Sequence, residues 1–521
     1  MNTERPARRS LWAGVVGALL VVAAGQPAAA QPTEPSAPFA EATVSVDLGA
    51  RQGELPRPER YNNFGNVTAW PEQRAGDVQF LNEQGLHGEA YRVWLSSPNA
   101  PAEDNVFNQC DLAANTCDFS PAIQAYLADA SAVSESVLVN LNPTDFVEAE
   151  RPLTDLEPLV ELILRSVKDR YPRVRYVEVF NEPDWQFHGL ERRMGRPADE
   201  TTLQPDDLYG FYVPFFEAVD AVNRNRANRD RLLVGGPALT SLDPRWMEPF
   251  LDDYAADTNP HKRLDFISYH AYLSWDENYQ APTLYNGDLS VVASERATID
   301  EWLRERHLRR NIPSFVTETG IYPGPAFDDP APRNDYLRQA AGLATYSYLY
   351  ANQPGATMFN WCVRHRVEER KDQLVTRTPN GPLPDTFSPY GNMLLMQSMM
   401  KDTRVSAESD TPLVDGDNGV YAMASTDRTG ASVMAWNWQH VHDGSYRTTI
   451  DMSRLPSHLR RGPVRQQLFR IDQSTSNYFA DPTTADLQPV GDDVVTPGRA
   501  HSLTVDLDPN AIYLIVMEPV S

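Results

Sequence analysis

The sequence predicts an α/β fold: a (β/α)8 TIM barrel with a C-terminal β-sandwich domain. Two patterns carry this prediction. From about residue 60 to residue 400, short apolar runs alternate with amphipathic helical stretches, and eight such runs suit a closed barrel of parallel strands. From Gly419 onward, short runs of alternating apolar and polar residues are separated by turn residues, as in a sandwich. A doubly wound sheet is the alternative for the first region.

The candidate barrel strands are eight short apolar runs. They span residues 61–64, 90–95, 137–141, 176–180, 232–235, 266–269, 314–317 and 356–360. Helical periodicity marks the stretches between them, as in 155–170, where Leu159, Ile163 and Val167 recur at i, i+4 and i+8. Because the carboxyl ends of barrel strands meet at one face, the residues that end these runs are expected to converge there.

The predicted sandwich covers about the last 120 residues and takes one strand from elsewhere. Residues 427–430 form a candidate hairpin turn, and Leu503, Val505 and Leu507 alternate with polar residues. The run 42–48 also alternates and precedes the barrel, so we expect it to complete the sandwich. The predicted domains are a signal peptide (1–30), a linker with the joining strand (31–54), the barrel (55–400) and the sandwich (401–521).

The N-terminus predicts export. Arg5, Arg8 and Arg9 precede an apolar stretch at 11–25, and small residues at 28–30 suit cleavage by a signal peptidase. The protein is therefore expected to be secreted or periplasmic, and the Arg8–Arg9 pair also fits a twin-arginine signal. No later stretch is apolar for the ~20 residues that a membrane helix needs, so no membrane partner is expected.

Composition narrows the class further. The 46 Lys and Arg against 71 Asp and Glu give a net charge of −25, which argues against general binding to nucleic acid. Cys110 and Cys117 lie close together in a polar stretch and are expected to form a disulfide, whereas Cys362 has the apolar neighbours of a buried thiol. The phosphate-loop, nucleophile-elbow and zinc-helix motifs are absent from the sequence, so no cofactor and no metal are expected.

Two carboxylates end predicted strands. Glu182 follows strand four in the segment VEVFNEP, and Glu318 ends strand seven in FVTETG. Glycoside hydrolysis needs such a pair, with one carboxyl to protonate the leaving oxygen and another to attack or to activate water. Either acid alone could be an ordinary strand-end or capping residue, but two acids in register with the strand pattern point to a glycosidase.

Over residues 60–400 the chain resembles a clan A glycoside hydrolase and is most similar to glycoside hydrolase family 39. Short motifs in a specific order carry the resemblance: YRVW (91–94), VEVFNEPDW (177–185), VGGPAL (234–239), DFISYHAY (265–272), FVTETG (315–320) and SPYGNMLLMQSM (388–399). The resemblance implies that Glu182 is the general acid/base and Glu318 the nucleophile. It also implies that Asn181 binds the sugar 2-hydroxyl and that Arg92 lies beneath Glu318 and lowers its pKa.

The resemblance implies four further contacts. His270 and Tyr272 match positions that contact nucleophile and substrate, Trp361 would form the floor of the sugar site, and Trp185 would lie in the cleft. The alternatives stay open: His270 as an ordinary strand-end histidine, Arg92 as the partner of a barrel acid, and the aromatic residues as packing residues. Glu178 is interpreted as structural.

Two departures bear on the substrate. The loop at 61–70 lacks the histidines that hold the sugar in xylosidase members, and Asn62 and Asn63 are candidates for that role. Basic residues also follow strand four (Arg192, Arg193, Arg196) and strand eight (Arg364, His365, Arg366, Arg370, Lys371). These clusters either recognise an acidic glycan through Arg forks or pair with neighbouring acids, and the many nearby acids favour ion pairs.

The predicted function is that of a secreted retaining glycoside hydrolase acting on a poly- or oligosaccharide by double displacement. Two alternatives differ in class: a non-catalytic glycan-binding barrel protein, and a transglycosylase that remodels polysaccharide with the same two acids. The expected partner is a carbohydrate substrate, with an acidic one as the open case. The sequence predicts neither the sugar, the linkage, exo or endo action, nor the oligomeric state.

Overall fold

A computed structural model describes residues 39–65, 71–95, 105–186, 204–272, 289–321, 333–364, 373–376, 386–412, 414–440, 443–478 and 480–520. These residues belong to the unit Phe39–Ser521. The predicted signal peptide lies outside the described residues. No helix within the described ranges is long and apolar enough to cross a membrane.

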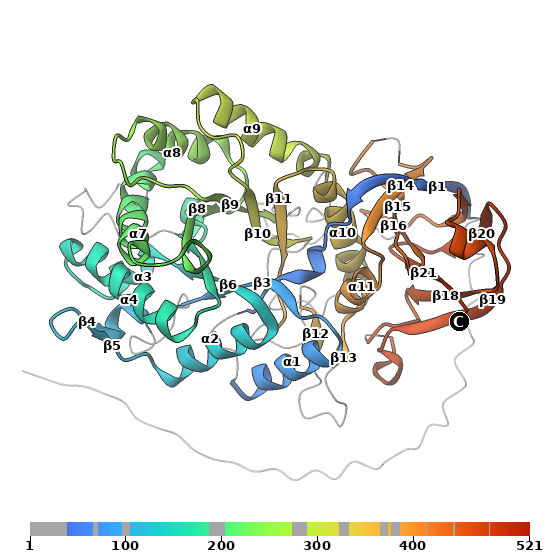
Figure 1. Ribbon diagram of the computed structural model, residues 1–521, viewed down its shortest axis with the longest axis horizontal. Coiled ribbons are helices and arrows are strands. Elements are labelled where there is room, and N and C mark those ends of the chain that lie inside the picture. Colours follow the sequence, from blue (N-terminus) through green and yellow to red (C-terminus); the bar gives the residue numbers. More distant parts are fainter. Residues whose placement is uncertain are drawn as a thin grey trace, which may run out of the picture. The chain divides into compact units, whose positions relative to one another are not determined.

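Eight parallel strands close into a barrel in the order β10-β11-β2-β3-β6-β7-β8-β9 (Figure 1). Their bounds are β2 (Tyr61–Asn63), β3 (Gly88–Trp94), β6 (Ser134–Leu141), β7 (Val174–Val179), β8 (Leu233–Leu239), β9 (Phe266–Tyr272), β10 (Ser314–Gly320) and β11 (Ala356–Asn360). Each of the eight predicted runs overlaps one of these strands. The barrel prediction is therefore confirmed, and the doubly wound alternative is wrong.

The helices between the strands cover the outside of the barrel (Figure 1). They are α1 (Pro71–Glu83), α2 (Pro121–Val133), α3 (Pro143–Glu148), α4 (Leu156–Arg170), α5 (Pro183–Gln186), α7 (Leu208–Asn223), α8 (Pro244–Ala256), α9 (Glu295–Glu305), α10 (Arg333–Ala351) and α11 (Pro389–Ser398). Short 3₁₀ turns are η1 (Pro58–Arg60), η3 (Val106–Gln109), η4 (Leu153–Asp155), η5 (Pro205–Asp207), η6 (Asn228–Asp230), η7 (Leu289–Ser294) and η8 (Pro482–Thr484). In α4 the predicted apolar stripe of Leu159, Ile163 and Val167 is fully buried, so the helical period does seat this helix on the barrel.

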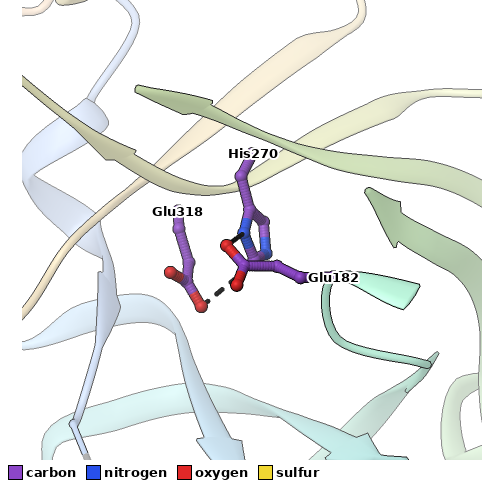
Figure 2. Close-up of side chains that lie close together, drawn as sticks. All are labelled: Glu182, His270 and Glu318. Atoms are coloured by element: carbon purple, nitrogen blue, oxygen red, sulfur yellow. Dashed lines mark hydrogen bonds and ion pairs between the residues drawn. The ribbon is translucent and has the colours of Figure 1, made fainter. Parts of the chain in front are cut away.

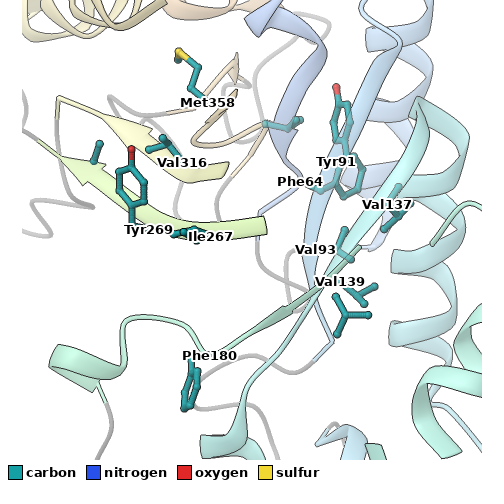
Figure 3. Close-up of a cluster of buried hydrophobic side chains, with 14 of the residues drawn as sticks. Phe64, Tyr91, Val93, Val137, Val139, Phe180, Ile267, Tyr269, Val316 and Met358 are labelled. Atoms are coloured by element: carbon teal, nitrogen blue, oxygen red, sulfur yellow. The ribbon is translucent and has the colours of Figure 1, made fainter. Parts of the chain in front are cut away.

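Two apolar layers hold the barrel together. The outer layer lies between strands and helices and includes Val93, Val137, Ile267 and Val316 (Figure 3). A smaller inner cluster fills the barrel and consists of Ala90, Leu138, Phe266, Phe315 and Phe359, with Tyr61 and Tyr176 packed against it. Its rings make close contacts, such as Phe266 stacked on Phe315 with centroids 4.7 Å apart. The barrel is therefore a packed core with one aromatic layer on which further inward-facing residues rest.

Nine further strands form one hydrogen-bonded sheet in the order β19-β18-β21-β16-β15-β14-β1-β17-β20. They are β1 (Ala40–Glu54), β14 (Thr403–Ser409), β15 (Gly419–Thr426), β16 (Ala431–Trp438), β17 (Tyr446–Ser453), β18 (Val464–Ile471), β19 (Gln488–Val495), β20 (His501–Leu507) and β21 (Ile512–Pro519). Side chains from eight of these strands share one core, which makes the sandwich. The predicted hairpin is present, with Asp427 N donating to Gly430 O over 3.0 Å.

The N-terminal strand completes the sandwich, as predicted. β1 pairs antiparallel with β14 and parallel with β17, and in Figure 1 the blue strand β1 lies beside the orange β14. Ala42, Val44, Val46 and Leu48 alternate into the core and are at most 3% exposed. The alternation of the run 42–48 therefore buries one face of a central strand.

Smaller elements complete the described chain. β4 (Cys110–Asp111) pairs with β5 (Thr116–Cys117), and the predicted Cys110–Cys117 disulfide joins them. β12 (Val375–Thr376) pairs with β13 (Thr386–Phe387), and α12 (Ser457–Arg460) follows β17. Cys362 is a buried thiol. The barrel and the sandwich share hydrogen bonds, such as that from Trp436 Nε1 to Thr345 Oγ1 over 2.8 Å.

Candidate active site

A polar layer lies one step above the aromatic layer inside the barrel. Strand alternation places a polar residue two positions beyond every residue of the aromatic layer except Phe359: Asn63 beyond Tyr61, Arg92 beyond Ala90, Asn140 beyond Leu138, Glu178 beyond Tyr176, Ser268 beyond Phe266 and Thr317 beyond Phe315. All six are at most 3% exposed. The two-residue period therefore carries polar groups to the end of the barrel where the strands finish.

Arg92 is the centre of this layer. Its Nε donates to Glu178 Oε2 and one Nη1–H donates to Glu318 Oε1, both over 2.6 Å. Nη1 also contacts Asn63 Oδ1 at 3.2 Å, and Nη2 donates to Asn181 Oδ1 over 2.8 Å. Burial opposes the charge of Arg92, but the two carboxylates raise its pKa above the ordinary value. Arg92 thus lies beneath Glu318, as the resemblance implied, and it also pairs with the barrel acid Glu178.

Glu318 is held from two sides. Arg92 binds Oε1, and the Tyr272 hydroxyl donates to Oε2 over 2.7 Å. Burial raises the pKa of the Glu318 carboxyl above its ordinary value, while His270, Arg92 and the Tyr272 hydrogen bond act against that rise. Arg92 thus lowers the pKa of Glu318, as the resemblance implied, but desolvation outweighs the cation and the net pKa is raised.

The carboxylates of Glu182 and Glu318 point toward each other, and His270 lies beside them (Figure 2). His270 Nδ1 lies 2.9 Å from Glu182 Oε1, and its Nε2 lies 3.6 Å from Glu318 Oε1. Burial lowers the pKa of His270, which favours the neutral imidazole between the two acids. One oxygen of each carboxylate and one nitrogen of His270 lie within 4.8 Å of one another.

The backbone that presents Glu182 is unusual. Glu182 has a φ of 49° and Phe180 a φ of 72°, in the left-handed region that non-glycine residues rarely adopt. Glu182 N donates to Ala238 O over 2.8 Å, which ties the turn to the end of β8. Asp184 accepts hydrogen bonds from Thr240 N and Thr240 Oγ1 and fastens the start of α5 to the same strand end. These contacts fix the turn that carries Glu182.

Asn181 has a defined amide orientation. Because its Oδ1 accepts from Arg92 Nη2, its Nδ2 is left as the donor on the other side of the amide. A donor at this point suits the sugar hydroxyl contact that the resemblance assigned to Asn181.

An aromatic wall stands beside the acids. Trp361 is 5% exposed and packs on Trp94, with ring centroids 5.6 Å apart. The Arg92 guanidinium lies 5.6 Å from the centroid of Trp94. Trp361 therefore belongs to the site through Trp94, which links it to Arg92.

Other predicted residues have different outcomes. The side chain of Trp185 lies outside the described residues, as do the arginines 192, 193, 196, 366 and 370, with His365 and Lys371. Asn62 Nδ2 donates to Glu59 O, so Asn62 is turned away from the acids and cannot replace a sugar-holding histidine. Arg364 is buried against Asp77 of α1, with Nη2 to Oδ1 at 2.8 Å, so it forms an ion pair rather than part of a glycan-binding cluster.

Glu182, His270 and Glu318 are also the described residues that could together offer ligands to a metal ion. Their oxygen and nitrogen atoms already contact one another, Arg92 and Tyr272. A guanidinium bound to Glu318 opposes a second cation there. The arrangement suits proton transfer and nucleophilic attack better than metal binding.

Sequence reasoning missed three members of the site: Asn63 as a ligand of Arg92, Asn140 and Trp94. Asn140 Nδ2 donates to Glu178 Oε2 over 2.9 Å, and together with Arg92 it holds that carboxylate. Both Arg92 and Asn140 act on Glu178, whose pKa they lower although burial alone would raise it. Asn140 interrupts the apolar run VLVNL near a strand end, which is the signal that could have identified it.

No protein-family model matches the sequence, and no curated protein matches it either. Solved structures do resemble the chain. The bacterial orthologue of human α-L-iduronidase matches with a TM-score of 0.65 and 13% identity over 92% of this chain and 84% of that one. A GH39 enzyme from Xanthomonas axonopodis pv. citri matches with a TM-score of 0.58 and 15% identity, over 92% of this chain and 98% of that one. A monomeric β-xylosidase from Caulobacter crescentus CB15 matches with a TM-score of 0.60 and 13% identity, over 92% of this chain and 100% of that one.

At these identities the likeness is one of fold. The predicted resemblance to clan A glycoside hydrolases is confirmed at that level, and a GH39 enzyme is among the similar structures. The chain thus has the fold of glycoside hydrolases, with two acids at the strand ends where barrel enzymes place their chemistry.

Proposed function

We propose that this protein is a retaining glycoside hydrolase in which Glu182 is the acid/base and Glu318 the nucleophile. The observation that carries the proposal is the convergence of Glu182 and Glu318 on His270, with Arg92 and Tyr272 binding the second acid. Carbohydrate substrates of the similar structures agree with this reaction class. The fold alone hosts many chemistries, so the proposal depends on the site.

The separation of the acids supports net retention. Inverting enzymes keep their carboxyl groups about 6.5–9.5 Å apart to admit a water molecule, whereas retaining enzymes keep them about 5–5.5 Å apart. One oxygen of Glu182 and one oxygen of Glu318 lie within 4.8 Å of each other, an approach that suits the closer spacing of retaining enzymes.

The proposed reaction has two steps. Glu182 donates its proton to the glycosidic oxygen while a Glu318 oxygen attacks the anomeric carbon; the C–O bond breaks and an alcohol leaves. Glu182, now a carboxylate, then takes a proton from water, whose oxygen attacks the anomeric carbon and releases Glu318. In this proposal Asn181 Nδ2 donates to the sugar hydroxyl and Arg92 holds Glu318 in its attacking position; the hydrogen bonds of Arg92 with Glu318 and Asn181 support both roles.

The test compares the parent chain with Glu318→Gln and Glu182→Ala on aryl glycosides and on neutral and acidic polysaccharides. Glu318→Gln should abolish hydrolysis. Glu182→Ala should retain more activity on substrates whose leaving group needs no protonation, and added azide should partly rescue it with formation of a glycosyl azide of retained configuration. Unchanged hydrolysis by Glu318→Gln would refute the proposal. Excess acceptor separates hydrolysis from transglycosylation by product analysis.

We also propose that the protein is exported. The basic, apolar and small-residue segments of the first 30 residues support a signal peptide. N-terminal sequencing of the protein recovered outside the cytoplasm should give a chain that begins near residue 31. Recovery of an uncleaved chain from the cytoplasm alone would contradict this.

A further inference from the structure

A groove of about 960 Å³ opens in the sandwich, between segments far apart in the sequence. It is lined by β1, the start of β14, the β15–β16 hairpin, and α12 with the residues that precede it. Asp402 in its wall forms an ion pair with Arg57, which lies just before β2. The groove therefore lies towards the N-terminal ends of the barrel strands, whereas Glu182 and Glu318 lie at the C-terminal ends.

Cations dominate this groove. Arg51, Arg428, Arg454 and Arg460 line it beside His458, and we call the concavity around these four arginines the cationic groove. Arg454 is paired with Asp47. The side chains of Arg51, Arg428 and Arg460 are exposed, and their guanidinium groups make no hydrogen bond or ion pair with any residue in the described ranges. The chain as a whole has a net charge of −25, whereas these three guanidinium groups give one concavity a local positive charge.

The acids of the groove offset these arginines only in part. Asp402 binds Arg57 Nη2 at 2.7 Å. Asp427 accepts hydrogen bonds within its own hairpin, from Thr429 N at 2.7 Å and Gly430 N at 3.0 Å, and these contacts help to lower its pKa. Asp402 is thus matched by Arg57, whereas Asp427 keeps its negative charge. Three guanidinium groups without an ion pair in the described ranges against this one carboxylate leave the groove positive and available to a ligand.

The lining selects the kind of ligand. A guanidinium fork binds planar carboxylates with two parallel hydrogen bonds. Hydroxyl groups of Thr403, Thr429 and Ser457 also line the groove and suit sugar hydroxyls. Apart from the imidazole of His458, the described lining holds no aromatic ring, so it lacks the flat apolar face on which a neutral sugar stacks.

We propose that the cationic groove binds an acidic polysaccharide through its carboxylates, at a site separate from the catalytic acids. The inference rests on the proposed function for the choice of a polysaccharide as the occupant. A polymer held in the groove keeps the enzyme on its substrate and raises the effective concentration of linkages at the catalytic end.

The test measures binding without turnover, in the full chain carrying Glu318→Gln. The groove variant is Arg428→Glu with Arg460→Glu. Its matched control is Arg229→Glu with Arg310→Glu, two exposed arginines of the barrel that change the net charge equally. The probes are polygalacturonate, unsubstituted xylan, dextran sulfate and duplex DNA, and thermal unfolding verifies that each variant folds.

Polygalacturonate should bind the parent in a salt-dependent manner. Its affinity should be about tenfold or more weaker for the groove variant and nearly unchanged for the control. Binding of xylan should be the same in the parent and in the groove variant. Failure of the parent to bind polygalacturonate, or equal binding by the groove variant, would overturn the proposal. So would equal affinity for dextran sulfate or DNA, which would make the groove a general anion surface.

Failure of the proposed function gives a different result. The hydrolysis test uses chains that keep the native Glu318. In such a chain the groove variant should hydrolyse small aryl glycosides at the rate of the chain with an intact groove, and it should be slower only on the acidic polymer. A parent that binds polygalacturonate through the groove but hydrolyses nothing would refute the proposed function and support the groove.

Discussion

Tyr272→Phe tests how Glu318 is kept ionised, because it removes one hydrogen bond and leaves the ring in place. The Tyr272 hydroxyl donates to Glu318 Oε2 over 2.7 Å. A hydrogen bond to a charged group contributes about 1.5–3 kcal/mol, and about 1.4 kcal/mol corresponds to a tenfold change in proton affinity. The bond favours the carboxylate, so its loss adds to the rise in the pKa of Glu318 that burial already causes.

The sign of the effect follows from the mechanism. The nucleophile must be ionised, and a higher pKa removes the ionised form first on the acidic side. The acidic limb of kcat/KM should therefore move to higher pH by roughly one pH unit or more. The assay is kcat/KM for an aryl glycoside from about pH 4 to pH 8.

Tyr269→Phe is the matched control, because Tyr269 lies on the same strand and donates to a different buried carboxylate, Glu295 Oε2, over 2.9 Å. This variant should change stability and leave the acidic limb in place. If Tyr272→Phe lowers kcat/KM equally at every pH, the hydroxyl acts on substrate rather than on the ionisation of Glu318, and the reasoning is refuted.

Three further predictions concern the buried charges and the disulfide. Glu178→Gln breaks the buried pair with Arg92 and should reduce the free energy of unfolding by about 3–5 kcal/mol in urea titrations, more than Asn140→Ala; a smaller loss than Asn140→Ala would contradict the assignment. Burial raises the pKa of Glu295 from 4.5 to about 7, so about 3 kcal/mol of stability that is fully present below pH 4.5 is lost as the pH rises from 4.5 to about 7. Glu295→Gln keeps a carbonyl oxygen for the hydroxyls of Tyr269 and Tyr350 and should raise Tm at pH 8 while leaving it nearly unchanged at pH 4, so equal shifts at both would count against it. Replacing Cys110 and Cys117 by serine should cost about 2 kcal/mol, measured by urea unfolding with and without reductant, and no difference would mean that the crosslink is absent in solution.

The fold and the acid pair could be predicted because both depend on local pattern. Apolar runs identify the barrel strands, and barrel closure then brings the ends of strands four and seven to one face without any knowledge of long-range contacts. Glu182 and Glu318 are found for that reason. The alternation of the run 42–48 likewise predicts its place in the sandwich, since this alternation requires one buried face.

Other features of the site could not be predicted from the sequence, because they depend on strand register, on long-range contacts and on burial. Asn62 and Asn63 are neighbours, yet only Asn63 points to Arg92, because one position in a strand reverses the face of the side chain. Arg364 pairs with Asp77 of α1, 287 residues away in the sequence, whereas the sequence suggested acids that are close to Arg364 along the chain. The net direction of the Glu318 pKa depends on how completely water is excluded, which no motif records.

The geometry of Arg92 explains why an arginine is required at this point of the barrel. The side chain contacts Glu178 through Nε, Glu318 through Nη1 and Asn181 through Nη2, so three edges of one planar group are used at once. A lysine would preserve the charge, but a single ammonium at the end of a flexible chain cannot hold three acceptors in those directions. With His270 kept neutral by burial, Arg92 is also the cation that Glu178 and Glu318 share in the described site. Arg92→Lys should therefore leave the two carboxylates partly compensated and still release Asn181, which separates loss of charge from loss of orientation.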